Sequence, residues 1–148
     1  MAGASIQVDF QDQAIQQALD KLIDRSDDMS ELFEAIGISL EGSHDDRWDA
    51  QQSPDGSPWA PLRPRTQARK KRNADKILTL DGFLRDSLAF NAGRDSLEFG
   101  TNLIYGATHQ FGADDRNIPA RPFLGISDDD EAMIEETLHD YLALALAE

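Results

Sequence analysis

The sequence predicts an α+β fold, in which helices pack on a small antiparallel sheet and a long basic loop extends from it. Several segments carry apolar residues at helical spacing, and short segments carry the alternating apolar residues of strands. The expected elements do not alternate regularly between strand and helix, which argues against a parallel sheet. A chain of 148 residues has the length of one domain, so 1–148 is interpreted as a single domain.

The N-terminal part predicts a strand or extended arm at 6–10, where apolar residues alternate, followed by two helices. In residues 11–25, apolar side chains recur at i, i+3, i+4, i+7 and i+8, which gives a helix one apolar stripe. Asp28 and Glu31 have the spacing of a capping box. The second helix is therefore expected to begin beside them and to continue toward Trp48.

The middle of the chain predicts turns and then the basic loop. Residues 53–64 contain a PDG turn and three further prolines, and Trp59 and Leu62 are expected to lie under the body. Residues 63–76 have little apolar content and no clear periodicity. They predict a mobile loop or hairpin within the domain.

A third helix and a strand are predicted next. The helix covers 79–90, with Thr79 as its N-cap and with an inward face made of Leu80, Phe83, Leu84, Ser87 and Leu88. Residues 91–93 are expected to form a turn. Alternation of Leu97 and Phe99 then predicts a strand.

Residues 105–127 are the most constrained part of the sequence. Pro119 and Pro122 lack a backbone donor and fix φ, so 118–126 is expected to be extended. Phe123 and its apolar neighbours supply enough hydrophobic surface for a strand, and a strand that contains proline belongs at a sheet edge. We therefore expect an edge that can pair with another copy of the protein.

The C-terminal part predicts an exposed acidic turn and a final helix. The turn covers 112–117. Ser127 is the expected N-cap of the helix, because the three aspartates at 128–130 then lie in its first turn, where the helix dipole favours anions. The expected buried side of this helix consists of Met133, Ile134, Leu138, Tyr141, Leu142 and Ala145.

The charge of the chain is unevenly distributed. The formal net charge is −14. Residues 63–76 contain seven cations and one aspartate and carry +6, which leaves −20 for the rest. The large negative charge of the rest of the chain argues against a general DNA-binding protein. No apolar run approaches the ~20 residues that span a bilayer, residues 1–10 lack the features of a signal peptide, and a membrane partner is not expected.

The sequence predicts no catalytic, cofactor or metal site, and we expect the protein not to be an enzyme. It has no cysteine, no GxSxG motif and no phosphate-binding loop. His44 precedes two aspartates, but the spacing of a known metal motif is missing. His109, between Tyr105 and Phe111, is interpreted as a hydrogen-bonded packing residue or as a subunit contact.

Three interpretations of the basic segment remain open: a solvated loop, a contact with the acidic surface of a neighbouring subunit, and a nonspecific contact with DNA phosphates. The cations that would make a partner or DNA contact are Arg63, Arg65, Arg69, Lys70, Lys71, Arg72 and Lys76. Arg121 has two alternative interpretations. It is either a surface charge that covers Phe123 or one partner of a bidentate salt bridge to a carboxylate on this chain or the next.

Four sequence blocks resemble one protein family. They are SPDGSPWAPLRPRT at 53–66, KILTLDGFLRDSL at 76–88, YGATHQFG at 105–112 and IPARPFLGIS at 118–127. In type and in order they resemble the phage virion morphogenesis (tail completion) family of Mu-like tailed phages. Asp81 stands before Gly82 where the family often has serine or threonine.

The resemblance implies a structural protein of the virion head–tail junction, made in the bacterial cytoplasm, that completes or terminates the tail or joins it to the head. It implies a homo-oligomeric ring, most simply a hexamer, that contacts other neck, connector or tail-tube proteins. Contact with DNA that passes through the channel stays one of the open interpretations of the basic segment. The alternatives are a nonspecific DNA-contacting accessory protein and a head-side assembly factor. The expected subunit interface consists of Tyr105, His109, Gln110, Phe111, Arg121 and Phe123.

Overall fold

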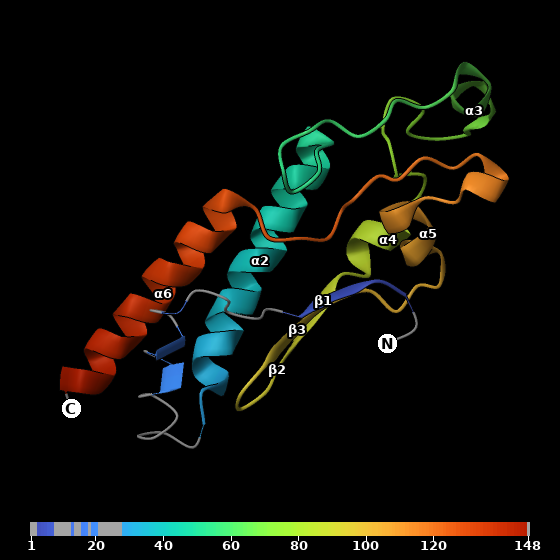
Figure 1. Cartoon of the computed structure of the whole chain (residues 1–148). Helices are drawn as coiled ribbons and strands as arrows, with labels where there is room; N and C mark the ends of the chain where they lie inside the picture. Colours follow the sequence, from blue (N-terminus) through green and yellow to red (C-terminus); the bar gives the residue numbers. More distant parts are fainter. Residues whose placement is uncertain (1–2, 8–12, 14–15, 18, 21–27, 148) are drawn as a thin grey trace.

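Two long antiparallel helices and a small sheet organise the molecule (Figure 1). The computed structural model describes residues 3–7, 13, 16–17, 19–20 and 28–147. Helix α2 lies between α6 and the sheet, and the short helices lie together at one end. The elements in chain order are β1 (Ser5–Gln7), α2 (Ser30–Ala50), α3 (Pro64–Arg69), α4 (Phe83–Asp86), β2 (Ala89–Ala92), β3 (Leu97–Gly100), α5 (Tyr105–Phe111), η1 (Asp114–Arg116) and α6 (Asp128–Ala147).

This arrangement confirms the predicted α+β class. Most of the expected first helix and the end of the expected first strand lie outside the described residues. The described part of that strand is β1, which pairs with β3.

The sheet is antiparallel and has the strand order β1-β3-β2. Leu97 and Phe99 on the central strand are fully buried, as their alternation predicts. Phe90 of β2 lies opposite Phe99. The turn predicted at 91–93 was placed too early: the hairpin closes at 93–96, where the Gly93 N–H donates to the Ser96 carbonyl at 2.8 Å.

The helix predicted at 79–90 is wrong in extent, because only one turn of it forms, as α4. Gly82 has φ +83°, a left-handed conformation that cannot continue a helix upstream of Phe83. The chain beyond α4 becomes strand β2. Leu80 and Phe83, which the helical pattern places inside, are 46% and 67% exposed.

Helix α2 runs for 21 residues and buries one continuous face. The capping box predicted from Asp28 and Glu31 is wrong, because Met29 is the N-cap residue and the cap has no side-chain hydrogen bond. The Asp28 carboxylate instead accepts a hydrogen bond from the Ser30 N–H at 2.9 Å. Gly37 lets the helix approach the sheet closely, since a Cβ there would lie 2.5 Å from the Phe90 ring.

Helix α6 begins as predicted. The Asp130 N–H donates to the Ser127 hydroxyl at 3.0 Å, and the Ser127 N–H donates to the Asp130 carboxylate at 3.0 Å. This reciprocal pair satisfies two donors at the start of the helix. Ile134 and Leu138 carry the buried face of α6 against α2, as expected.

The basic segment is not simply a loop. Pro64 fixes φ at the first position of α3, where a missing N–H costs nothing, and the residues after it form a six-residue helix. Lys70 ends this helix, and its ammonium donates to the carbonyls of Lys76 and Thr79 at 2.5 and 2.7 Å. The described segment is therefore tied back to the body at its C-terminal side.

Candidate interaction surface

Residues 118–126, here called the strap, form an extended chain that belongs to no strand. The prediction of extended backbone is confirmed, but the prediction of an edge strand is wrong. Among the described residues, the strap backbone makes one bridge, between Ile118 and Ala113, and one bond from the Arg121 N–H to the His109 carbonyl. The other hydrogen bonds to the strap backbone come from side chains elsewhere in the chain. Proline has no N–H, so a regular ladder could not satisfy the carbonyls that face this backbone.

Gln110 on α5 takes the place of a neighbouring strand. Its Oε1 accepts hydrogen bonds from the N–H groups of Phe123 and Leu124, both at 3.0 Å, and its Nε2 donates to the Leu124 carbonyl at 3.0 Å. One side chain thus satisfies three backbone groups of the strap. Gln110, expected at a subunit interface, has this role within its own chain.

Arg121 and Trp59 join the strap to the segment that precedes α3. Arg121 Nε donates to the Ala60 carbonyl at 2.7 Å, and Nη2 donates to the Pro61 carbonyl at 3.1 Å. In the other direction, Trp59 Nε1 donates to the Pro122 carbonyl at 2.7 Å. The two side chains therefore fasten the two segments together from both sides.

This geometry corrects the surface-charge interpretation of Arg121, whereas a salt bridge to a neighbouring copy stays a prediction. The residue is 8% exposed, so it is not a surface charge. Among the described residues it forms no salt bridge. Burial lowers the pKa of Arg121, and the nearby Arg63 charge lowers this pKa further. Phe123 is 1% exposed and packs against Trp48, with ring centroids 5.3 Å apart, so it is a core residue.

One side of the strap faces a cavity of about 590 Å³, here called the basic pocket. Its charged lining consists of Arg63, Lys70, Arg116 and Arg121 with a single carboxylate, Asp81. Asp81 forms an ion pair with Arg72. Its apolar lining includes Leu80, Phe83, Tyr105, Ile118 and Pro119. The pocket thus combines an excess of positive charge with exposed hydrophobic walls.

His109 lies in the wall of the basic pocket. Its ring meets the Tyr105 ring edge-on, with centroids 6.1 Å apart, and its backbone carbonyl accepts a hydrogen bond from the Arg121 N–H at 2.7 Å. Burial lowers the pKa of His109, as do the charges of Arg121 and Arg116. The Nδ1 atom is buried and finds no hydrogen-bond partner among the described residues. The His109 ring thus packs on Tyr105 and has one buried polar atom without a partner among the described residues, and its role in a subunit contact stays a prediction.

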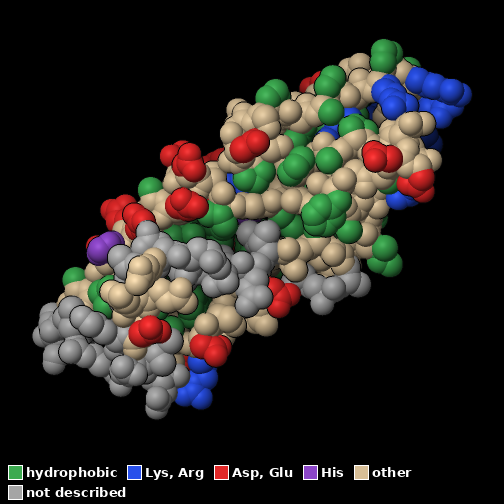
Figure 2. Space-filling model, viewed as in Figure 1, with side chains coloured by type: hydrophobic (Ala, Val, Ile, Leu, Met, Phe, Trp, Pro, Cys, Tyr) green, Lys and Arg blue, Asp and Glu red, His purple; other side chains and the backbone are tan. Residues whose placement is uncertain are grey.

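The cations of the basic segment gather at the end of the molecule that carries α3 (Figure 2). Arg63 donates to the Asn117 carbonyl at 3.1 Å, and Arg72 pairs with Asp81. The others expected to contact a partner are exposed, apart from the half-buried Lys70, and include Arg65, Arg69, Lys71 and Lys76. Many Asp and Glu side chains lie over α6 on the same face (Figure 2).

The other side of the strap lines a second cavity of about 1060 Å³, here called the acidic groove. Ala120, Pro122 and Leu124 line this groove, whereas Arg121 faces the basic pocket, as alternation along an extended chain requires. The charged groups of the groove are Asp55, Asp128 and Asp129, and its lining contains no lysine or arginine. The strap therefore separates two surfaces of opposite charge.

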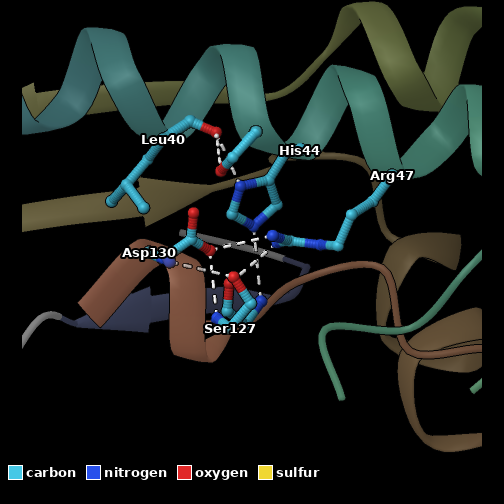
Figure 3. Close-up of polar contacts among 7 residues, drawn as sticks. Leu40, His44, Arg47, Ser127 and Asp130 are labelled. Carbon is cyan, nitrogen blue, oxygen red and sulfur yellow. Dashed lines mark hydrogen bonds and ion pairs between the residues drawn. The ribbon is translucent and has the colours of Figure 1, made fainter. Parts of the chain in front are cut away.

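A buried polar cluster fixes the strap to the two long helices (Figure 3). Arg47 donates to the Asp130 carboxylate at 2.8 Å and to the Gly125 carbonyl at 2.9 Å. His44 Nδ1 donates to the Leu40 carbonyl at 2.7 Å, and Nε2 accepts from the Gly125 N–H at 3.3 Å. These bonds fit a neutral imidazole. Sequence reasoning missed this cluster, since its members come from distant parts of the chain.

Burial dominates the ionisation of His44. Burial lowers the pKa of His44 to about 4, and the Arg47 charge acts in the same direction. Burial alone raises the pKa of Asp130, but the hydrogen bonds from Ser127 and Arg47, together with the Arg47 charge, lower it overall. A neutral histidine and an ionised aspartate thus lie side by side. Among the described residues, no three histidine, cysteine, aspartate or glutamate side chains lie together where they could hold a metal ion.

Comparison with known proteins identifies the family. Residues 10–143 match the phage virion morphogenesis family. The chain belongs to this family. It is 33% identical over 126 residues to tail completion protein S of Escherichia phage P2, a match that covers 75% of this chain and 82% of the relative. It is 28% identical over 142 residues to putative capsid assembly protein G of Escherichia phage Mu, covering 89% and 90% of the two chains. No solved structure matches it.

Three of the four blocks that indicated the phage virion morphogenesis family meet at the strap. The first supplies Trp59, the third supplies Gln110, and the last is the strap itself. The remaining block contributes Thr79, whose hydroxyl accepts a hydrogen bond from Trp48 Nε1 at 3.2 Å. These motifs therefore supply hydrogen bonds that hold the fold of this family member together.

The six predicted interface residues of this family member divide into three groups. Tyr105, His109 and Arg121 line the basic pocket together with the basic segment. Gln110 and Phe123 hold the strap to the core. Phe111 lies outside the pocket and is 74% exposed. Sequence analysis placed Leu80 and Phe83 inside, although both are exposed, and Gly82 between them was the signal that the helix begins only at Phe83. Within the described residues, no helix is long and apolar enough to cross a membrane.

Proposed function

We propose that this protein completes the phage tail at the head–tail junction, where its copies form a ring and contact other neck, connector or tail-tube proteins. The name of the phage P2 relative, a tail completion protein, supports this placement. The name of the phage Mu relative refers to capsid assembly, so the two names refer to different parts of the virion.

One observation carries the proposal: the described surface concentrates exposed apolar side chains at the end that also carries the basic segment. Seven large apolar residues are exposed in the described chain, and five of them belong to or adjoin α4 and α5. They are Leu80, Phe83, Ile104, Tyr105 and Phe111. An exposed apolar surface of this kind, bordered by charge, is typical of a site that binds another protein.

A ring requires that each copy present two unlike faces, one to each neighbour. The basic end and the acidic groove are unlike in charge and lie on different sides of the strap. The resemblance to a six-fold class of tail favours six copies. A structural role of this kind needs no reaction centre.

The decisive experiment is deletion of the gene in the phage, with complementation from a plasmid. We expect filled heads and tails to accumulate separately without the protein and to join when it is supplied. Mass spectrometry of isolated tails and of isolated filled heads then assigns the protein to one side of the junction. Infectious particles of normal yield in the deletion strain, or mature particles that lack the protein, would contradict the proposal.

Nonspecific contact with DNA is a second candidate function, favoured by the exposed cations of α3 and of the residues that follow it. A contact with phosphates would weaken steeply as salt rises. Retention of the purified protein on DNA of unrelated sequences at low ionic strength, lost when Lys71 and Lys76 are changed to glutamate, would support it. Normal tail joining by that variant would separate DNA binding from tail completion.

A further inference from the structure

Helix α3 presents a cationic surface that the rest of the described chain does not cover. None of its residues is buried. Thr66 of α3 and Lys70, the residue after the end of α3, line the basic pocket, whereas Arg65 and Arg69 do not. Because they are four residues apart, Arg65 and Arg69 lie on one face of the helix. Neither takes part in an ion pair with another described residue.

The acidic groove has the complementary properties. Three exposed carboxylates, those of Asp55, Asp128 and Asp129, lie in its lining. The Asp55 carboxylate is held in place, because it accepts hydrogen bonds from the Ser57 hydroxyl at 2.5 Å and from the Ser57 N–H at 2.9 Å. Prolines and Trp59 supply the apolar part of the lining, on which the aliphatic stem of an arginine can pack.

The α3 helix of the same chain is at the wrong end of the strap to fill this groove. Arg63, at the start of α3, contacts the carbonyl of Asn117, where the strap begins. Asp128 and Asp129 follow the opposite end of the strap (Figure 1). Nine extended residues separate the two ends by roughly 25 Å. Arg65 and Arg69 of the same chain are therefore far from Asp128 and Asp129, at the opposite end of the strap.

We propose that Arg65 and Arg69 of one copy bind in the acidic groove of the next copy, beside Asp55, Asp128 and Asp129. This inference rests on the ring of the proposed function and names its contact. The contact is head-to-tail, so it repeats around the ring without using the same surface twice. Each exposed ion pair stabilises the contact only weakly, which makes assembly sensitive to salt.

Two oppositely altered variants test the contact. Arg65→Glu/Arg69→Glu reverses the helix, and Asp128→Lys/Asp129→Lys reverses the groove. We expect each variant alone to show a subunit dissociation constant raised at least about tenfold, measured by light scattering after size-exclusion chromatography. An equimolar mixture should reassemble, because each altered face then meets an oppositely charged partner. Circular dichroism and thermal unfolding confirm that each variant is folded.

Arg63→Glu/Arg116→Glu is the matched control, since it changes the charge by the same amount within the basic pocket. If this control and the α3 variant weaken assembly equally, or if the mixture does not reassemble, the assigned contact is wrong while the ring stands. A wild-type protein that stays monomeric in solution and occurs once per particle would overturn the ring itself. Loss of DNA retention by the α3 variant with unchanged assembly would reassign α3 to DNA.

Discussion

Two glycines in α2 allow the packing of that helix on the sheet to be measured. A Cβ added at Gly37 would lie 2.5, 2.6 and 2.7 Å from three atoms of the Phe90 ring. Ordinary carbon contacts lie at about 3.5–4.0 Å, so the ring or the helix must move by roughly 1 Å. At Gly42, in the same helix, a Cβ would meet nothing within 4 Å.

The two substitutions therefore share one energy term and differ in another. Alanine in place of glycine stabilises a helix interior by about 0.5–1 kcal/mol. Gly42→Ala should show this gain alone. Gly37→Ala adds an overpacking cost of about 1–3 kcal/mol, so it should be neutral to destabilising by up to about 2 kcal/mol. The difference between the two variants isolates the overpacking cost, because the helix propensity cancels.

Urea unfolding followed by tryptophan fluorescence measures this difference, since Trp48 and Trp59 are both buried in the core. Phe90→Leu in the Gly37→Ala background should recover part of the loss, because it removes ring atoms from the contact. Equal stabilisation by Gly37→Ala and Gly42→Ala would refute the reasoning. It would mean that α2 does not press on β2 as described.

Three further predictions concern the strap and its anchors. Gln110→Ala should destabilise the fold by about 2–4 kcal/mol, because two strap N–H groups and one carbonyl lose their partner. The control Gln67→Ala, on exposed α3, should change the unfolding free energy by less than about 0.5 kcal/mol. Urea unfolding of both variants measures the two changes. His44 should make the protein less stable in acid: its folded pKa of about 4 lies below the ordinary value of 6.5, so the unfolded state takes up the proton first and stability falls as pH drops from about 6.5 to 4. The expected loss of unfolding free energy between pH 7 and 5 is about 2 kcal/mol. A His44→Gln variant whose stability falls equally steeply over this range would contradict the assignment. The pKa of Asp130 is lowered, so the stability that Asp130 contributes is lost only below its ordinary pKa of 3.8, outside this range. Arg47→Met should lower the unfolding free energy by about 3–5 kcal/mol, because it leaves the Asp130 carboxylate buried without its cation. A double-mutant cycle with Asp130→Asn should give a coupling energy above about 1 kcal/mol. Additive losses would show that the pair does not interact in solution.

The elements that local sequence could predict are those whose signal is local. The apolar stripes of α2 and α6 recur within a few turns of helix, and the Ser127 cap depends on residues close to it in sequence. All three were predicted. The start of the third helix was not, because the apolar spacing of 79–90 fits a helix while Gly82 adopts φ +83°. In the strap, proline predicted extended backbone, but its partners are side chains.

The site was predictable only in part, for the same reason. Tyr105, His109 and Arg121 were expected at a subunit interface. All three line the basic pocket, and their role in an interface stays a prediction. The excess of basic residues at 63–76 predicted a charged end. The acidic groove could not be predicted, since Asp55 and Asp128 are far apart in the chain and meet only because the strap lies between them.

This arrangement decides which substitutions can test assembly. Arg121 and Phe123 were expected to form the interface between copies, yet one fastens the strap to the segment before α3 and the other fills the core. Replacing either one by alanine would shift both charged surfaces at once, so lost assembly would not show which surface failed. Arg65 and Arg69 are exposed and contribute nothing to the core. A loss of assembly in their variants, with folding unchanged, must therefore come from the contact between copies.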